Sequence, residues 1–64
     1  MNLNKRELQV LQLLCAGLTH KQIADKLHMS RRTSECIRAR IGEKTGCGAS
    51  STQLGVWAAK QGLA

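Results

Sequence analysis

The sequence predicts an all-α domain of four helices, and two repeated features carry that prediction. Three segments, 4–7, 19–22 and 50–53, begin with Asn, Thr or Ser and end with Glu or Gln. Such a capping box satisfies backbone N–H groups at a helix start, and apolar residues at helical spacing follow each box. Gly17 and Gly62 follow two of these apolar stretches, and glycine there is typical of a left-handed helix stop.

The first two helices are expected over residues 5–16 and 20–27. Apolar side chains cover most of the circumference of the first and leave only a narrow polar stripe, so we expect it to be central and mostly buried. The second is short and places Ile23, Ala24 and Leu27 on one face. Because Ala24 is small, another helix can cross the second helix closely at that point.

A third helix is expected over residues 31–44, capped by Ser30. The turn before it has roughly three residues, which is a helix-turn-helix spacing. Five cationic and two acidic residues give this helix a net charge of +3, whereas its apolar stripe consists chiefly of Ile37 and Ile41. Gly42 is expected to favour fraying near the end, because a helical glycine costs about 1 kcal/mol relative to alanine. Most of the surface of this helix is therefore available to a partner.

The fourth helix is expected over residues 51–61, with Leu54, Trp57 and Ala58 on the arc that faces the core. The opposite arc carries small or apolar residues on the side that should meet solvent. Small residues allow two backbones to approach closely, so we interpret this arc as a dimer seam, against the alternative of a solvated, Ala-rich helix. The predicted seam consists of Thr52, Gly55, Val56, Ala59 and Leu63.

Length and charge limit what the chain does. Sixty-four residues make one small domain, which excludes a nucleotide-binding α/β fold, a barrel or a multi-domain enzyme. Ten Lys and Arg against four Asp and Glu give a net charge of +6, which attracts a polyanion. Nucleic acid is the expected partner, ahead of an anionic membrane surface or of charge that only aids solubility. One Trp and no Phe or Tyr provide no aromatic platform for single strands, which favours duplex DNA.

No cluster of residues predicts catalysis, a metal site or a cofactor. Three cysteines without C-x-x-C spacing fit neither a disulfide scaffold nor a zinc finger, and we interpret them as core fillers or reduced surface thiols. His20 and His28 are expected to be surface residues, and no nucleophile–base pair is spaced for an enzyme. The chain has no apolar signal-peptide core and no membrane-spanning apolar run, so we expect a cytoplasmic location.

Short segments along the whole chain resemble the LuxR/GerE-type helix-turn-helix DNA-binding domain. They are Leu3–Glu7, Val10–Leu11, Leu13–Thr19, Lys21–Ala24, Leu27, Met29–Ser30, Thr33, Ile41, Lys44, Gly46, Gln53–Leu54 and Gly62–Leu63. The segments are colinear and need no insertion. The resemblance implies a four-helix domain whose third helix enters the DNA major groove and whose fourth helix pairs two subunits. It therefore implies a sequence-specific transcriptional regulator that acts as a homodimer.

Three positions depart from the family pattern, which usually has an aliphatic residue at Ser34, a His at Ile37 and a Leu at Thr45. We interpret Ile37 as replacing core volume that Ser34 no longer supplies, so we expect a slightly rotated or differently packed third helix. The family usually attaches this domain to a sensing or phosphoacceptor domain. We therefore expect either a stand-alone member or a fragment, and Met1, three residues before the first cap, favours a natural start.

Two other functions remain open at this point. A lone domain of this type can pair through its fourth helix with a larger LuxR-type regulator and inhibit it. This alternative is supported by the three positions that depart from the family pattern, Ser34, Ile37 and Thr45. A sigma-factor-like fourth region shares part of the pattern, but the small outward arc of the fourth helix favours the LuxR/GerE-type interpretation. A steep salt dependence of duplex binding separates DNA binding from a role that involves only protein.

The charge of the third helix and the resemblance together give the expected DNA contacts. Ser30 and Thr33, with the free N–H groups of the helix start, are placed to bond a phosphate oxygen. Arg32 is expected to pair with guanine, whereas Glu35 either accepts from a cytosine amino group or orients a neighbouring arginine. The expected set is Lys21, Ser30, Arg31, Arg32, Thr33, Glu35, Cys36, Arg38, Ala39, Arg40 and Lys44.

Overall fold

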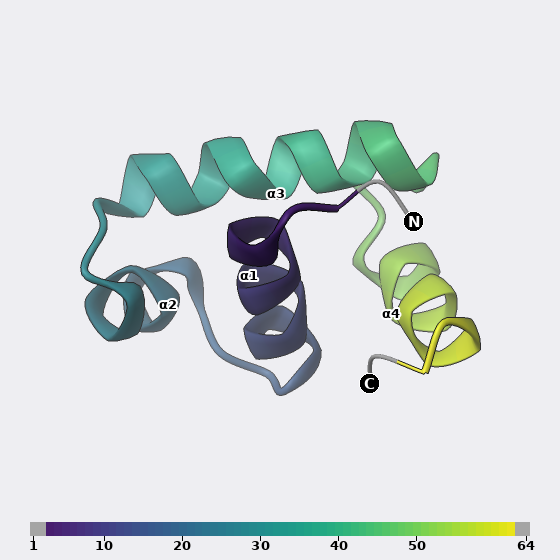
Figure 1. Ribbon diagram of the computed structural model, residues 1–64, viewed down its shortest axis with the longest axis horizontal. Helices are drawn as coiled ribbons and strands as arrows, with labels where there is room; N and C mark the ends of the chain where they lie inside the picture. The colour runs from purple at the N-terminus through teal and green to yellow at the C-terminus, as the bar shows by residue number, and fades with distance from the viewer. Residues whose placement is uncertain (1–2, 63–64) are drawn as a thin grey trace.

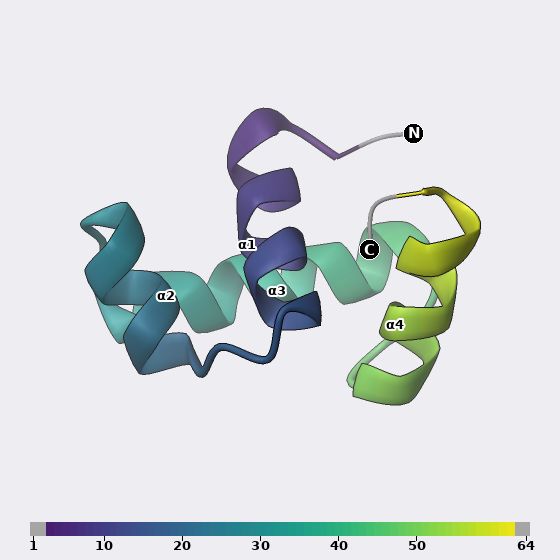
Figure 2. The same ribbon diagram turned by 90° about the horizontal axis from the view of Figure 1, so that it is seen from below.

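The computed structural model describes residues 3–62, and in that range it contains four helices and no strand. The helices are α1 (Lys5–Cys15), α2 (His20–Leu27), α3 (Arg31–Thr45) and α4 (Ser51–Lys60). α3 is the longest, and the other three helices all lie on the same side of it (Figure 1). A view turned by 90° shows that α2, α1 and α4 follow one another along the length of α3 (Figure 2). The predicted all-α fold class is confirmed, and one long side of α3 is left uncovered by the other helices.

Capping boxes start the first two helices, as predicted. The Oδ1 atom of Asn4 accepts a hydrogen bond from the backbone N–H of Glu7 at 2.8 Å, and the backbone N–H of Asn4 donates to Glu7 Oε1 at 3.0 Å. Thr19 and Gln22 make the same reciprocal pair at 3.2 and 2.9 Å. Each pair satisfies two backbone donors that have no partner inside the helix.

The third predicted capping box is only half formed, and that prediction is corrected here. Ser50 Oγ accepts from the backbone N–H of Gln53 at 3.2 Å, as expected. The backbone N–H of Ser50 does not need the Gln53 side chain, because it donates to the carbonyl oxygen of Cys47 at 3.2 Å. The loop before α4 therefore supplies the acceptor that a Gln side chain supplies at α2.

The observed helix ends differ from the predicted ranges by at most one residue. α1 ends at Cys15 rather than residue 16, α3 continues to Thr45 rather than ending at 44, and α4 ends at Lys60 rather than 61. α2 ends in a left-handed cap that is not glycine, His28 with φ 56°. This cap turns the chain towards α3 within the short helix-turn-helix connection.

The core draws on all four helices. It consists of Val10, Leu11, Ile23, Ile37, Ile41, Leu54 and Ala58. The predicted inward residues of α2 and α4 are confirmed, with Leu27 and Trp57 partly buried against this cluster. The expectation that α1 is mostly buried is wrong. Its buried apolar residues are Val10 and Leu11, whereas Leu8, Leu13 and Leu14 are only partly buried and Cys15 is exposed. Sixty residues of described chain are too few to cover α1 on every side.

Gly42 does not weaken α3, contrary to the expected fraying. It is buried, and a Cβ atom at this position would collide with the carbonyl oxygen of Gly48. The backbone N–H of Gly48 donates to the carbonyl oxygen of Gly42 at 3.1 Å. The helix then continues through Thr45, whose Oγ1 donates to the carbonyl oxygen of Ile41 at 2.8 Å. Glycine at position 42 therefore serves the close approach of the loop that leads to α4.

The substitution Gly42→Ala is expected to lower the free energy of unfolding by about 1–3 kcal/mol, because the new Cβ forces the Gly48 backbone away. Gly55→Ala is the matched control, since a Cβ at this helical position meets nothing within 4 Å. That variant is expected to gain about 0.5–1 kcal/mol from helix propensity. Urea unfolding followed by circular dichroism measures both, and a Gly42→Ala variant as stable as Gly55→Ala contradicts the close approach.

Candidate nucleic-acid interface

The N-terminus of α3 combines two exposed hydroxyl groups with a helix start. Ser30 Oγ accepts from the backbone N–H of Thr33 at 3.1 Å, and the two side-chain oxygens are hydrogen-bonded at 2.8 Å. One hydroxyl proton is used in that bond, so the other remains able to donate to an outside acceptor. Together with the positive end of the helix dipole, these groups favour an anion at this end of α3.

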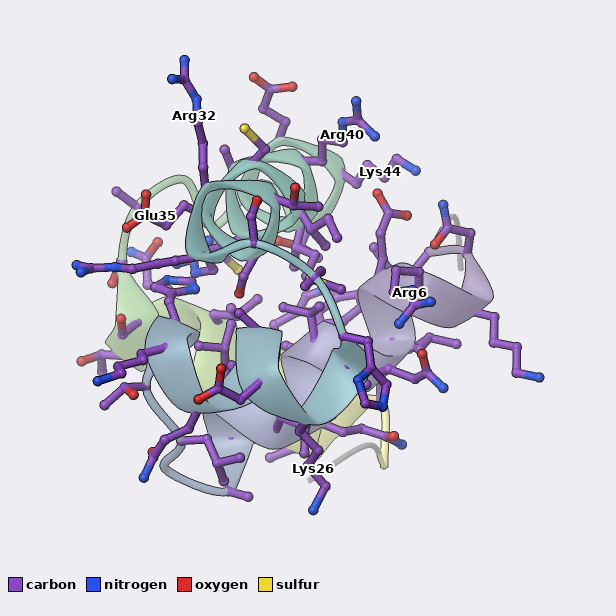
Figure 3. The ribbon with its side chains drawn as sticks, turned by 90° about the vertical axis from the view of Figure 1, so that its left-hand side faces the viewer. Arg6, Lys26, Arg32, Glu35, Arg40 and Lys44 are labelled. Carbon is purple, nitrogen blue, oxygen red and sulfur yellow. The ribbon has the colours of Figure 1, made fainter. Side chains whose placement is uncertain are left out.

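The uncovered side of α3 carries arginines that extend away from the protein. Figure 3, which looks along α3, shows Arg32 and Arg40 pointing outward from the helix. Within residues 3–62 neither guanidinium takes part in a hydrogen bond or an ion pair. Both border a shallow hollow of about 330 Å³, which is lined by Ser30, Arg32, Thr33, Cys36, Ile37 and Arg40. Hydroxyls and arginines expected to contact DNA thus meet on one surface, while Ala39 is exposed on the same helix.

Arg31 and Glu35 form an ion pair one helical turn apart. The Arg31 Nε atom lies 3.3 Å from Glu35 Oε1, and the two side chains are 71% and 49% exposed. Such an exposed pair contributes little to stability because water screens it. In the free protein Glu35 therefore contacts an arginine. This is the arrangement expected if Glu35 orients a neighbouring arginine rather than accepting a hydrogen bond from cytosine.

Arg38 faces the loop before α4 rather than the uncovered side of α3. Its Nη1 atom donates to the carbonyl oxygen of Gly48 at 3.0 Å, and the residue is half-buried. The sequence predicts Arg38 among the DNA contacts because the arginines of the third helix are expected to neutralise phosphates. Its position on the helix turns it towards α4 instead.

Lys44, also expected to contact DNA, forms an ion pair with the buried carboxylate of Glu7. Lys44 Nζ lies 2.8 Å from Glu7 Oε1, the same oxygen that accepts from the backbone of Asn4. Glu7 is 2% exposed and the Lys44 side chain 37%. The hydrogen bonds from Lys44 and Asn4 hold the pKa of the Glu7 carboxyl below its usual value, against the effect of burial.

The sequence pattern predicts Glu7 only as part of a helix cap. Its second role had a signal in the spacing, because residue 7 precedes Val10 and Leu11 by three and four positions and so shares their buried face. An acidic residue on a buried helical face requires a cationic partner. Which lysine or arginine supplies it depends on how α1 crosses α3.

Ser34 and Ile37 occupy the buried side of α3. Ser34 has no exposed surface, and its Oγ is hydrogen-bonded to His20 Nδ1 at 2.9 Å. Ile37 is 8% exposed and belongs to the core, as expected. The expectation that His20 is a simple surface residue is corrected, because it is half-buried and satisfies the hydroxyl that replaces an aliphatic side chain.

Two exposed lysines of α2 bear on contacts proposed for the α3 side. Lys21, the predicted phosphate contact of α2, is exposed. Lys26 also belongs to α2 but lies on the side of the molecule opposite to Arg32 (Figure 3). This difference makes Lys26 a suitable control for contacts proposed on the α3 side.

The predicted seam on α4 is exposed in its central part. Val56 is 51% exposed, and Thr52 and Ala59 are exposed beside it, whereas Gly55 is half-buried. Leu63 lies outside the described residues. Next to Val56 is a largely apolar hollow of about 330 Å³, lined by Cys47, Thr52, Gln53, Val56, Trp57 and Lys60. Val56 is the exposed large hydrophobic residue of the described chain.

Residues 3–62 contain no group of three or more His, Cys, Asp or Glu side chains placed to hold a metal ion. In the same range, no helix is long and apolar enough to cross a membrane.

The chain was compared with known proteins and families. The family described as bacterial regulatory proteins, luxR family, matches residues 1–58. The virulence-factor transcription regulator BvgA of Bordetella pertussis is 43% identical over 42 residues, which are 66% of this chain and 20% of that protein. The oxygen regulatory protein NreC of Staphylococcus aureus is 43% identical over 44 residues, 69% of this chain and 20% of that protein. The chain thus spans about a fifth of the length of these curated relatives. No solved structure matches.

Substituting the buried carboxylate tests the ion pair between α1 and α3. A carboxyl whose pKa is lowered by folding stabilises the protein above its unfolded-state pKa, and that stabilisation is lost as pH falls through the lower folded-state value. Glu7→Gln is therefore expected to lower the free energy of unfolding at pH 7 by about 1–3 kcal/mol and to flatten its decline below about pH 4.5. Glu43→Gln, at an exposed position near the same end of α3, is the control. Unfolding curves from pH 3 to 7 that are parallel for the two variants rule out the proposed role of Glu7.

Proposed function

Because this chain belongs to the luxR family of bacterial regulatory proteins, we propose that it binds double-stranded DNA with α3 in the major groove and regulates transcription. The observation that carries the proposal is the uncovered side of α3. There Arg32 and Arg40 extend into solvent, and neither forms an ion pair or a hydrogen bond among the described residues. A cationic helix exposed along its length has the shape and the charge to enter a major groove.

Phosphate contacts in this proposal come from groups that carry no sequence information. The hydroxyls of Ser30 and Thr33 and the N–H groups at the start of α3 bond a phosphate oxygen. Lys21 on α2 neutralises a second phosphate, and Arg40 neutralises a third from the flank of α3. Arg31 contributes less to phosphate binding, because its charge is partly neutralised by the ion pair with Glu35. These contacts set affinity and salt dependence.

Base contacts come from the first half of the uncovered side, from Arg32 in the first turn of α3 to Ala39. Arg32 is free to pair bidentately with guanine, the commonest specific contact in the major groove. Cys36 and Ala39 are exposed on the same helix and are small enough to lie against a thymine methyl group. Sequence preference is therefore carried by Arg32 with a small neutral surface next to it.

A homodimer through α4 accounts for the exposed apolar surface at Val56. The proposed seam comprises Thr52, Gly55, Val56 and Ala59, with Leu63 at its end. Two copies paired in this way place two α3 helices on one duplex, so the preferred sequence is a palindrome with half-sites about one helical turn apart.

A second candidate function is pairing with another luxR-type regulator through the same surface of α4, which inhibits that regulator. The exposed Val56 favours it as much as it favours a homodimer. The internal bonds of Arg38 and Lys44 also leave fewer cations for DNA than the net charge of α3 implies. Duplex affinity that falls steeply between 50 and 200 mM salt favours DNA binding, because displaced counterions drive that fall.

Substitutions of single cations separate base contacts from phosphate contacts. Arg32→Ala is expected to relax the preference at one base position, at a cost of about 1–3 kcal/mol for the preferred sequence. Lys21→Ala is expected to weaken binding to all duplexes alike, and Lys26→Ala to change little. Selection of bound duplexes from a random pool, followed by anisotropy titrations, measures these effects. Equal weakening of all sequences by both Arg32→Ala and Lys21→Ala contradicts base reading by Arg32.

Val56→Asp is expected to abolish the homodimer, because a charge at the centre of the seam is buried without a partner when two copies pair. Sedimentation should show a monomer, and affinity for the selected palindrome should fall to that of a single half-site. Thr52→Ser changes the same surface conservatively and serves as the control. If the Val56→Asp variant still binds the palindrome as two copies, α4 does not form the dimer seam.

A further inference from the structure

We propose that Arg38 is a positioning residue that fixes α4 against α3 and thereby sets the spacing of the two half-sites that a homodimer prefers. The inference rests on the proposed function, since half-site spacing has a meaning only for a dimer on DNA. It replaces the expected role of Arg38 as a DNA contact. Arg38 acts on Gly48, whose carbonyl oxygen it binds.

Both backbone polar groups of Gly48 are bonded to α3. Its carbonyl oxygen accepts from Arg38 Nη1 at 3.0 Å, and its N–H donates to the carbonyl oxygen of Gly42 at 3.1 Å. The missing side chain at Gly42 is what lets the Gly48 backbone approach so closely. Gly48 comes two residues before Ser50, the cap of α4. The start of α4 is therefore tied to the body of α3 through a very short segment.

Packing alone does not fix the N-terminal half of α4. A hollow of about 380 Å³ lies beside it, lined by Leu14, Cys15, Gly17, Leu18, Arg38, Ser51, Leu54 and Gly55. A Cβ atom at Gly55 would meet nothing within 4 Å, so this face of the helix has free space next to it. Leu54 and Ala58 anchor α4 to the core on one side only. The bond from Arg38 to the Gly48 carbonyl oxygen thus acts together with the Gly48–Gly42 backbone bond to limit tilting of the start of α4 into the hollow.

A small tilt of α4 matters because the dimer seam lies on α4 while DNA meets α3. In a homodimer, the angle between these two helices in each copy sets the separation of the two α3 helices. α3 has 15 residues and is about 22 Å long. If the angle between α4 and α3 changes by about 10°, the far end of α3 moves by about 4 Å relative to the dimer seam. That displacement is close to the rise of about 3.4 Å per base pair. Without the Arg38 bond, tilts of this size therefore broaden the range of accepted spacings by about one base pair.

Selection from a random duplex pool tests the inference, with the unsubstituted protein, Arg38→Ala and Arg38→Lys run in parallel. Arg38→Ala should recover the same half-site sequence with a broader range of spacings. Its preference for the best spacing over one longer by a base pair should fall about fivefold, the factor that one hydrogen bond represents. Arg38→Lys should keep the narrow range, because an ammonium group can still donate to the Gly48 carbonyl.

The possible outcomes of the selection test the positioning role of Arg38, the homodimer and DNA binding separately. An unchanged spacing with Arg38→Ala overturns the positioning role and leaves the proposed function intact, whereas an altered half-site sequence means that Arg38 reads bases. A single half-site recovered by the unsubstituted protein overturns the homodimer, and no enriched sequence overturns DNA binding; the inference then falls with them. If circular dichroism shows that Arg38→Ala is unfolded, Arg38→Met takes its place, because it keeps the apolar stem without the donor.

Discussion

The surface that α3 offers to a partner depends on how little of the helix is buried in the core. Its buried residues are Ser34, Ile37, Ile41 and Gly42, a strip on one side of a 15-residue helix. A wider apolar face would draw the helix further into the protein and cover the side that carries Arg32. The narrow strip leaves that side in water, but it also gives α3 little apolar surface with which to hold its position.

Polar contacts therefore also fix the position of α3, and each one connects the helix to a different part of the chain. The pairs are Ser34 with His20 of α2, Arg38 with Gly48 of the loop before α4, and Lys44 with Glu7 of α1. They occur near the start, the middle and the end of the helix. A helix held at three points along its length presents its outward side chains in a fixed orientation, which recognition of base edges requires.

The same contacts divide the charge of α3. Arg38 and Lys44 are bonded within the protein and Arg31 shares its charge with Glu35. Arg32 and Arg40 are the guanidiniums of the helix without an ion pair or a hydrogen bond, although Arg40 still acts at longer range on the Glu7 carboxylate. The salt dependence of duplex binding reflects the cations that reach phosphates, so it should be smaller than the composition of α3 suggests. Exposed positive charge, rather than total positive charge, is therefore the quantity that connects this structure to its proposed partner.

The sequence by itself determined the all-α class, the helix ranges to within one residue, the caps at Asn4, Thr19 and Ser30, and the apolar core positions of α2, α3 and α4. These features depend on groups within about four residues of one another, so composition and spacing specify them. Only the tertiary structure decided which cations of α3 face outward and which are held. The contacts that decide this join residues 10, 14 and 37 positions apart, and they form only once the helices cross. Local spacing gives no information about such pairs, because many lysines and arginines satisfy a buried carboxylate equally well until packing selects one.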